Sequence, residues 1–357
     1  MDPDRIAHMT TPWGLPDFDA HEDLHFIDDE KCGLKAIIAV HSTHLGPAAG
    51  GARFWHYAED AEAVTDALRL SRGMSYKNAM AGLPLGGGKS VILATAERTK
   101  SPDLLHAFGK AVDHLGGRYV TAEDVGMSVA DMIEVRRSTR FVAGLPNSGS
   151  DVGGDPGPHT SLGVFLGIKA AVKRALGKDD VAGLHIAVQG AGSVATGVAL
   201  HSAAEGARLS IADVDQAKAK KLADATGGNV VAPDDILTIE ADVVSPNALG
   251  AILNEQTIAS LNTPIVAGGA NNQLATAQDG ARLQQRGILY APDYVINAGG
   301  IINVCTEYLG DGDASLVRRR IEDIPVRLEQ IWAESETSGR DPASVADAMA
   351  QRLIGRA

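Results

Sequence analysis

The spacing of apolar residues in the first part of the chain predicts alternating strands and helices. Residues 35–41 (KAIIAVH) form a short apolar run that is typical of a strand. Four apolar residues then recur at helical spacing: Ala61, Val64, Leu68 and Met74. They predict an amphipathic helix over residues 59–76. A glycine-rich loop is expected at residues 82–88, followed by a strand at 90–95 (SVILAT).

The pattern changes after residues 146–158 (PNSGSDVGGDPGP), whose density of Gly, Pro, Asp and Ser predicts a loop between two domains. Beyond this loop, a helical pattern at 160–175 leads to a strand at 184–189, and helices and strands alternate to about residue 305. Such alternation is typical of a doubly wound parallel sheet. The tail, residues 316–356, is charged and helical and contains no strand pattern.

We therefore expect an α/β protein of two domains separated by a cleft, with a helical tail. A mixed-sheet domain is predicted over residues 1–147 and a doubly wound domain over residues 148–325. The helices of residues 326–357 are expected to pack back on the first domain or against another subunit.

Charge and cysteine content exclude several kinds of partner. The net charge of −13 disfavours nucleic acids and anionic membranes, because both attract basic surfaces. The only two cysteines, Cys32 and Cys305, form neither a disulfide framework nor a CxxC metal pair. The first residues lack the basic and apolar regions of a signal peptide, and no apolar run approaches the ~20 residues of a membrane span. We expect a cytoplasmic protein that binds neither nucleic acid nor membranes.

A glycine motif in the second domain predicts a dinucleotide site. Gly190 would permit a tight turn after the strand, Gly192 would let the backbone approach a pyrophosphate, and Ala195 would allow close helix packing. The following strand ends at Asp213, whose carboxylate would accept the ribose hydroxyls and repel a 2′-phosphate. The pattern therefore favours NAD over NADP.

The glycine-rich segment at residues 82–90 contains Lys89 but does not match a phosphate-binding P-loop. That motif requires glycine at the position of Leu83 and a helix after the lysine, whereas a strand is predicted there. Lys89 instead joins Lys77 and Asp124 as candidate catalytic groups. Each could be a solvated surface charge, but both lysines lie in apolar, glycine-rich sequence without a charged run around them.

Several segments resemble the Glu/Leu/Phe/Val dehydrogenase family, in the family's order and over nearly the whole chain. They are residues 46–54 (GPAAGGARF), 70–77 (LSRGMSYK), 86–89 (GGGK), 121–126 (TAEDVG), 269–272 (GANN), 291–300 (APDYVINAGG) and the dinucleotide segment. The resemblance implies a first domain for substrate binding and oligomerisation and a Rossmann-type NAD domain. It also implies a homo-oligomer that reversibly converts an L-amino acid to a 2-oxo acid, ammonia and NADH.

The resemblance also implies roles for individual residues. Lys77 would hold the substrate carboxylate, Lys89 would act on the hydrolytic water and the carbonyl, and Asp124 would be the general acid and base at the amino group. The remaining substrate contacts that it implies are Gly46, Leu45, Met74, Asn272, Ala122, Ile301 and Val304. The cofactor contacts that it implies are Thr160, Gly190, Gly192, Ser193, Val194, Asp213, Ala248, Asn271 and Asn297.

Two positions bear on the choice of amino acid. Family members that use glutamate carry a lysine where this chain has Ala49, so a glutamate side chain would be an unpaired charge. Ile301 fills the space that phenylalanine-type members leave for a ring. These positions favour leucine or another branched-chain acid, with phenylalanine as the alternative.

Other residues depart from the family pattern or suggest other functions. Met127 replaces a small hydroxyl residue, and Gly157 replaces a serine expected at the cofactor phosphates. The spacing of His41, His44 and His56 does not match a metal motif, so no metal site is expected. A different Rossmann hydroxy-acid dehydrogenase and a catalytically silent NAD-binding protein remain as alternatives.

Overall fold

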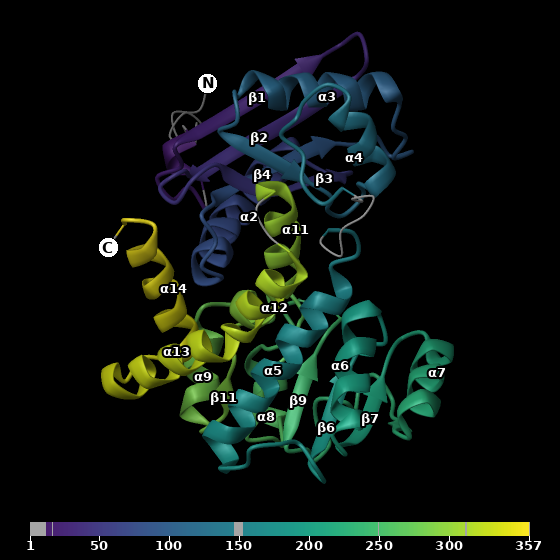
Figure 1. Ribbon diagram of the computed structural model, residues 1–357, viewed down its shortest axis with the longest axis vertical. Coiled ribbons are helices and arrows are strands. Elements are labelled where there is room, and N and C mark those ends of the chain that lie inside the picture. Colours follow the sequence, from purple (N-terminus) through teal and green to yellow (C-terminus); the bar gives the residue numbers. More distant parts are fainter. Residues whose placement is uncertain (1–11, 16, 146–152, 249, 311–312, 357) are drawn as a thin grey trace, which may run out of the picture. The chain divides into compact units, whose positions relative to one another are not determined.

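The computed structural model describes residues 12–15, 17–145, 153–248, 250–310 and 313–356, which form two compact units (Figure 1). The first unit comprises the described residues up to Gly154, together with Glu307–Gly310 and Arg352–Arg356. The second comprises the described residues of Asp155–Thr306 and Asp311–Gln351. Most of the predicted interdomain loop, residues 146–152, lies outside the described residues.

The first unit is built on a mixed five-stranded sheet with the strand order β1-β2-β4-β3-β5. Its elements are η1 (Pro12–Gly14), β1 (Asp23–Asp29), β2 (Leu34–Ser42), β3 (Ala48–Trp55), α2 (Asp60–Met80), β4 (Gly86–Leu93), α3 (Pro102–His114), β5 (Tyr119–Ala122) and α4 (Val129–Arg136). Strand β2 is antiparallel to β1 and β4, whereas β3 is parallel to β4 and β5. The β3–β4–β5 side therefore brings the carboxyl ends of three strands to one edge.

Both faces of this sheet are covered by helices (Figure 1). Successive residues of a strand point to opposite faces. Accordingly, Ile37 and Ala39 pack with the apolar side of α2, whereas Ile38 and Val40 pack in the cluster that contains Phe108 of α3. Every residue of β2 except Lys35 is therefore buried.

The glycines before Lys89 form part of strand β4 rather than the loop that the sequence predicts. The strand begins at Gly86, and these glycines occur there because the neighbouring backbone approaches closely. A Cβ on Gly87 would lie 2.0 Å from the Ser75 backbone nitrogen in α2, and one on Gly88 would lie 2.7 Å from the Tyr119 ring. The expectation of a flexible loop before Lys89 was wrong, because glycine here permits contact between helix and sheet.

The second unit contains a six-stranded, fully parallel sheet with the order β11-β10-β9-β6-β7-β8. The strands are β6 (His185–Gln189), β7 (Arg208–Ala212), β8 (Asn229–Val230), β9 (Val243–Pro246), β10 (Ile265–Val266) and β11 (Leu289–Tyr290). The helices are α5 (Gly157–Leu176), α6 (Ser193–Ala204), α7 (Gln216–Thr226), α8 (Glu255–Ser260), α9 (Gln278–Gln285), α10 (Asp293–Ile296), α11 (Gly299–Leu309), α12 (Ala314–Glu322), α13 (Ile324–Ser338) and α14 (Pro342–Leu353). The order is that of a Rossmann fold, and the predicted two-domain α/β class is confirmed.

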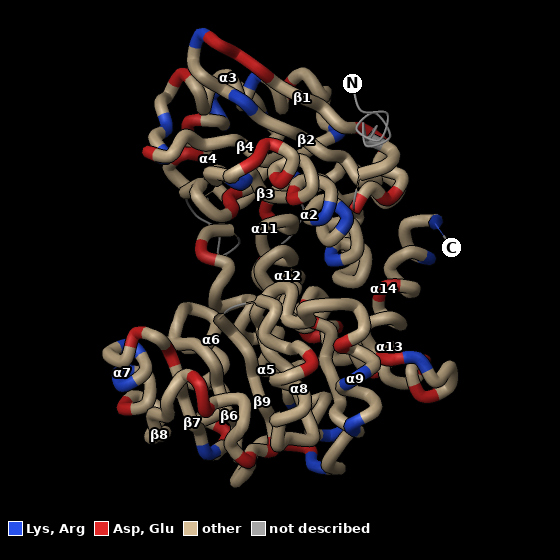
Figure 2. Tube along the Cα trace, turned by 180° about the vertical axis from the view of Figure 1, so that it is seen from behind, with Lys and Arg blue, Asp and Glu red and all other residues tan. Residues whose placement is uncertain are grey.

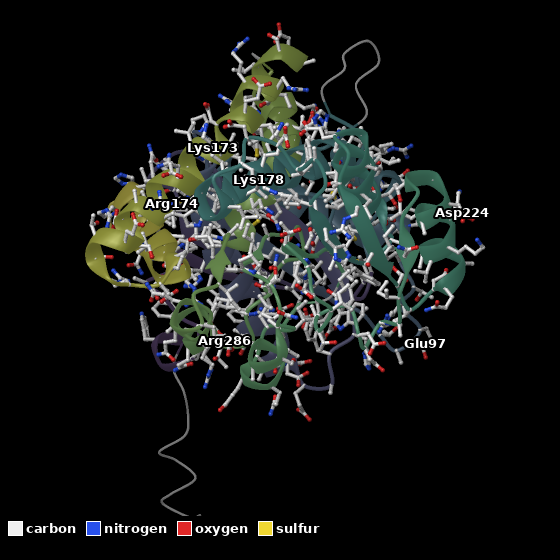
Figure 3. The ribbon with its side chains drawn as sticks, turned by 90° about the horizontal axis from the view of Figure 1, so that it is seen from below. Glu97, Lys173, Arg174, Lys178, Asp224 and Arg286 are labelled. Carbon is white, nitrogen blue, oxygen red and sulfur yellow. The ribbon has the colours of Figure 1, made fainter. Side chains whose placement is uncertain are left out.

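Helices α12 and α13 belong to the second unit. The reason is the apolar side of α13, where Trp332 is buried and its Nε1 donates to the Tyr290 carbonyl at 2.9 Å. Arg174 of α5, labelled in Figure 3, donates to Glu336 of α13 at 2.7 Å. Within the tail, only Arg352–Arg356 belongs to the first unit.

The surface charges of the described residues are interleaved. Figure 2 shows both basic and acidic positions on α7, where Lys220 forms an ion pair with Asp224 at 2.9 Å. Within the described part of the chain, no helix is both long enough and apolar enough to cross a membrane.

Candidate functional site

The first unit brings two of the predicted catalytic residues into direct contact. The Lys89 Nζ lies 3.0 Å from the Asp124 Oδ2. Lys89 lies within β4, and Asp124 follows the carboxyl end of β5. The Lys89 side chain is 6% exposed and that of Asp124 is 23% exposed, so the pair is largely shielded but reachable.

Glycine and a tight turn deliver Asp124 to this position. A Cβ on Gly51 of β3 would lie 2.8 Å from the Asp124 Cβ, so only glycine lets the loop approach the strand this closely. The Met127 amide donates to the Asp124 carbonyl at 2.9 Å, and the Lys100 Nζ donates to the Gly126 carbonyl at 2.6 Å. The Met127 side chain is buried in the apolar cluster beneath α3, which accommodates this departure from the family pattern.

The two charges of the pair influence one another through burial. Burial lowers the pKa of Lys89, and the nearby Asp124 carboxylate only partly opposes this effect. Burial alone would raise the pKa of Asp124, but the charges of Lys89 and Arg53 outweigh it and hold this pKa below its ordinary value. The site therefore combines an ionised carboxylate with a lysine that loses its proton more readily than a solvated lysine does.

The other substrate residues predicted in this unit lie on α2, on the loop before β3 and at the end of β5. Lys77 and Met74 are half-buried and three residues apart, so they share one face of the last turns of α2. Close contact between Gly87 and Ser75 holds this helix against β4. Gly87 lies two residues before Lys89 in β4, and Ser75 lies two residues before Lys77 in α2.

The loop before β3 contains a glycine that no other residue could readily replace. Gly46 has a φ of +142°. A Cβ at this position would lie 2.3 Å from the Pro84 carbonyl oxygen. The Gly46 carbonyl accepts a hydrogen bond from the Gly86 amide at 3.2 Å and retains a second lone pair. Leu45 and Ala122 are both partly exposed.

The remaining predicted substrate residues belong to the second unit. Ile301 and Val304 are three residues apart in α11, so they lie on one face of that helix. Ile301 is half-buried and Val304 is 9% exposed. Asn272 is exposed and has a φ of +52°, a left-handed conformation that asparagine tolerates better than most residues.

The predicted dinucleotide residues cluster where the strand order reverses, between β6 and β9. Ligands of doubly wound sheets bind at this switch point, outside the carboxyl ends of the strands. Gly190 follows β6 with a φ of +100°, and a Cβ on it would lie 3.2 Å from the Cβ of Ala248, which follows β9. Asp213 accepts hydrogen bonds from the Ala191 amide at 2.7 Å and the Asp215 amide at 2.8 Å. Its carboxylate is thus fixed beside the glycine turn.

Helix α6 begins at Ser193 with Gly192 as its N-cap and no side-chain cap. The first-turn amides, including those of Ser193 and Val194, have no partner within the helix and suit a phosphate. A Cβ on Gly157 would lie 2.1 Å from the Ser193 Oγ. This explains the missing serine at 157, because the hydroxyl of Ser193 already occupies that space. The Thr160 hydroxyl donates to the Pro156 carbonyl at 2.9 Å.

A buried, unsatisfied amide oxygen tests whether this site fits NAD. The Nδ2 of Asn297 donates to the Asn271 Oδ1 at 2.7 Å and to the Gly269 carbonyl at 3.1 Å. Its Oδ1 is buried and has no hydrogen-bond partner. Buried acceptors without partners are costly, and a carboxamide N–H of a nicotinamide would satisfy this one. The residues present therefore fit the cofactor.

The sequence interpretation gave no role to Arg53, although it lies in a quoted motif. The structure places its guanidinium between Asp124 and Asp66 of α2, at 2.9 Å and 2.8 Å. No local pattern joins these residues, because they are 71 and 13 positions away from Arg53. Within the described residues, no cluster of three or more His, Cys, Asp or Glu side chains could hold a metal ion.

Comparison with known proteins identifies the family of this chain. The family described as "Glu/Leu/Phe/Val dehydrogenase, dimerisation domain" matches residues 21–140, and the one described as "Glutamate/Leucine/Phenylalanine/Valine dehydrogenase" matches residues 209–351. The chain is 45% identical to leucine dehydrogenase of Bacillus subtilis over 94% of this chain and 92% of that protein. It is 43% identical to valine dehydrogenase of Streptomyces albus over 94% of this chain and 93% of that protein.

A solved structure of another amino-acid dehydrogenase is also similar to this chain. The crystal structure of L-tryptophan dehydrogenase from Nostoc punctiforme superposes with a TM-score of 0.83 and 40% identity, covering 94% of this chain and 96% of that one. The identity and coverage are high enough to establish the family and the fold. The chain is an amino-acid dehydrogenase and belongs to the Glu/Leu/Phe/Val dehydrogenase family.

Proposed function

We propose that this enzyme catalyses the NAD⁺-dependent, reversible oxidative deamination of a branched aliphatic L-amino acid, with leucine preferred. The observation that carries the proposal is the contact between Lys89 and Asp124, which pairs a buried amine with an ionised carboxylate. Amine oxidation followed by hydrolysis needs such a pair, because protons must leave the substrate nitrogen and the attacking water.

In the proposed mechanism, Lys77 binds the substrate carboxylate and the Asp124 carboxylate accepts a proton from the substrate amino group. NAD⁺, when bound, accepts the hydride that leaves the substrate Cα. Neutral Lys89 then takes one proton from the water as its oxygen bonds to the imine carbon, which gives a carbinolamine with a hydroxyl group. Asp124 returns its proton to the nitrogen, and the C–N bond breaks to release ammonia while the hydroxyl loses its proton to solvent and becomes the carbonyl. The positive charge of protonated Lys89 would stabilise the negative charge that develops on this oxygen.

The proposal of NAD rather than NADP is supported by Asp213. Its carboxylate is fixed by two backbone amides at the end of β7, where a 2′-phosphate would meet a negative charge. Asn271 and Asn297 would hold the carboxamide, and the first-turn amides of α6 would hold the pyrophosphate.

The preference for a branched aliphatic substrate is supported by the residues predicted to contact the substrate side chain. Ala49 is 4% exposed and provides no positive charge for a side-chain carboxylate. The side chains of Leu45 and Ala122 in the first unit, and of Ile301 and Val304 in the second, are all apolar. Two of the similar proteins are named for branched aliphatic amino acids, as leucine dehydrogenase and valine dehydrogenase.

A substrate panel tests this preference. Purified enzyme would be assayed for NADH formation with leucine, valine, isoleucine, phenylalanine and glutamate, and with NADP⁺ replacing NAD⁺. Leucine should lead, and glutamate should react at least about 10³-fold more slowly, because a buried unpaired carboxylate costs several kcal/mol. In Ile301→Ala, the ratio of phenylalanine to leucine turnover should rise about tenfold. Phenylalanine leading in the unmodified enzyme would overturn the substrate assignment and leave the reaction type in place.

The fit between Gly157 and Ser193 gives a prediction for cofactor binding. Gly157→Ser should weaken NADH binding about tenfold, because the new side chain would meet the Ser193 hydroxyl at the start of α6. The double variant with Ser193→Gly removes that clash and should recover affinity to within about threefold of the original. Titration of NADH fluorescence would measure both. Unchanged affinity in Gly157→Ser would show that the two positions do not compete for space.

We also propose that the enzyme is a homo-oligomer. The description of the family that matches residues 21–140 as a dimerisation domain supports this proposal. Sedimentation velocity would test it, and a monomer at assay concentrations would contradict it.

A further inference from the structure

The side chain of Arg53 connects the catalytic carboxylate to a second carboxylate on α2. Its Nε donates to the Asp124 Oδ2 at 2.9 Å, and its Nη1 donates to the Asp66 Oδ2 at 2.8 Å. Arg53 comes from β3, Asp66 from α2 and Asp124 from the loop after β5, so one side chain joins three elements. The Arg53 side chain is 21% exposed, which separates it from an ordinary solvated ion pair.

Asp66 is itself held in place, which fixes Arg53. The Tyr57 hydroxyl donates to the Asp66 Oδ2 at 2.6 Å, and the Arg69 Nη2 donates to its Oδ1 at 2.8 Å. Burial would raise the pKa of Asp66, but the hydrogen bonds from Tyr57 and Arg69 and the charge of Arg53 keep it below its ordinary value. These contacts favour the ionised form of Asp66, and movement of Arg53 away from it would leave a partly buried charge with fewer partners.

This arrangement determines which oxygen of Asp124 is available. Arg53 and Lys89 both contact Oδ2, at 2.9 Å and 3.0 Å. Within the described residues, no hydrogen bond reaches Oδ1 of Asp124. The carboxylate is thus fixed through one oxygen, and the other is left to meet a substrate amino group.

We propose that Arg53, anchored by Asp66, is a positioning residue for the dehydrogenase reaction that orients the Asp124 carboxylate toward Lys89 and the substrate amine. This inference rests on the proposed roles of Lys89 and Asp124. Arg53 acts through Asp124 and does not itself contact a reacting atom. Loss of its guanidinium would let the carboxylate rotate, and misplacement of a catalytic group by about 1 Å can cost about 10²-fold in rate.

The same residue also influences the pH at which the site works. The charged groups facing Asp124 are Lys89 from β4 and Arg53 from β3, with Asp66 of α2 behind them. Burial raises the pKa of Tyr119 in β5 to about 12, so it remains neutral. The Arg53 charge lowers the pKa of both Lys89 and Asp124. Its removal raises both, so neutral Lys89 becomes available only at higher pH.

Three variants test the inference. Arg53→Gln should lower kcat for deamination about 10²-fold and move the acidic limb of its pH profile upward by about one unit. Arg53→Lys keeps the charge but cannot bridge two carboxylates, so its limb should stay in place while kcat falls about tenfold. Arg137→Gln is the control: it removes an exposed arginine that pairs with Glu134 at 3.1 Å and contacts neither Asp66 nor Asp124, so kcat should remain within about twofold.

The outcomes separate this inference from the proposed function. If the unmodified enzyme deaminates no amino acid, the proposed function itself fails. If it is active, and Arg53→Gln keeps the original kcat and pH profile, the positioning role is overturned. If Arg53→Gln lowers kcat without moving the acidic limb, and Arg137→Gln lowers kcat equally, the effect is a general structural one and the positioning role is also overturned. If Arg53→Gln does not fold, Arg53→Lys provides the test. An unchanged kcat in Arg53→Lys would contradict the inference, whereas a reduced kcat with an unchanged acidic limb of the pH profile would support it.

Discussion

Replacement of Asp124 by asparagine is expected to lower turnover about 10³-fold while leaving NADH binding unchanged. General acid–base catalysis contributes about 10²–10⁴-fold, and an amide of the same shape cannot accept the proton of the amino group. Lys89→Ala should have a loss of similar size. The double variant should be little worse than either single one, because residues that act as a unit give non-additive effects.

Steady-state kinetics with leucine, together with NADH titration, would measure these effects. Asp103→Asn provides a matched control, since Asp103 is an exposed carboxylate in the first turn of α3. It should behave as the original enzyme does. Near-normal turnover in Asp124→Asn would remove this residue from the mechanism, even if the fold and cofactor binding were intact.

The second large effect is expected for Gly87→Ala, which should destabilise the first unit by about 3 kcal/mol or more. The added Cβ would lie 2.0 Å from the Ser75 backbone nitrogen and 2.4 Å from its Cα, and neither atom can rotate away. Helix α2 would have to move, taking Lys77 with it, so activity should fall together with stability.

Gly73→Ala, in the same helix, tests the reasoning in the opposite direction. A Cβ on Gly73 meets no atom within 4 Å, so alanine should stabilise the protein by about 0.5–1 kcal/mol through helix propensity. Thermal unfolding of both variants would show the contrast. Equal melting temperatures for Gly87→Ala and the original enzyme would mean that α2 does not pack on β4 as closely as described.

The sequence allowed the fold class to be predicted because hydrophobic periodicity reports burial directly. The strand predicted at 35–41 occurs as β2, and the glycine turn after β6 precedes α6 as expected. The tail was less predictable, because apolar residues such as Trp332 show that a helix face is buried but not against which partner. The role of the glycines before Lys89 was misjudged for a related reason. Glycine indicates either a turn or a close backbone approach, and only the position of Ser75 distinguishes the two.

The site shows the same limit. Lys89 and Asp124 could be singled out from motifs, and they lie 3.0 Å apart. Arg53 could not, because its partners are brought together by three different elements. The absence of the expected serine at 157 became understandable only with the Ser193 hydroxyl in view. Local motifs therefore identify reacting groups, whereas the groups that orient them depend on tertiary structure.

The most direct test of the account follows the hydride and the nitrogen together. The enzyme would be incubated with NAD⁺ and L-leucine carrying deuterium at Cα, and NADH and ammonia would be quantified with mass analysis of the NADH. The account predicts one deuterium transferred to each NADH and one ammonia released for each NADH formed. NADH without deuterium, or NADH formed without ammonia, would contradict oxidative deamination at this site.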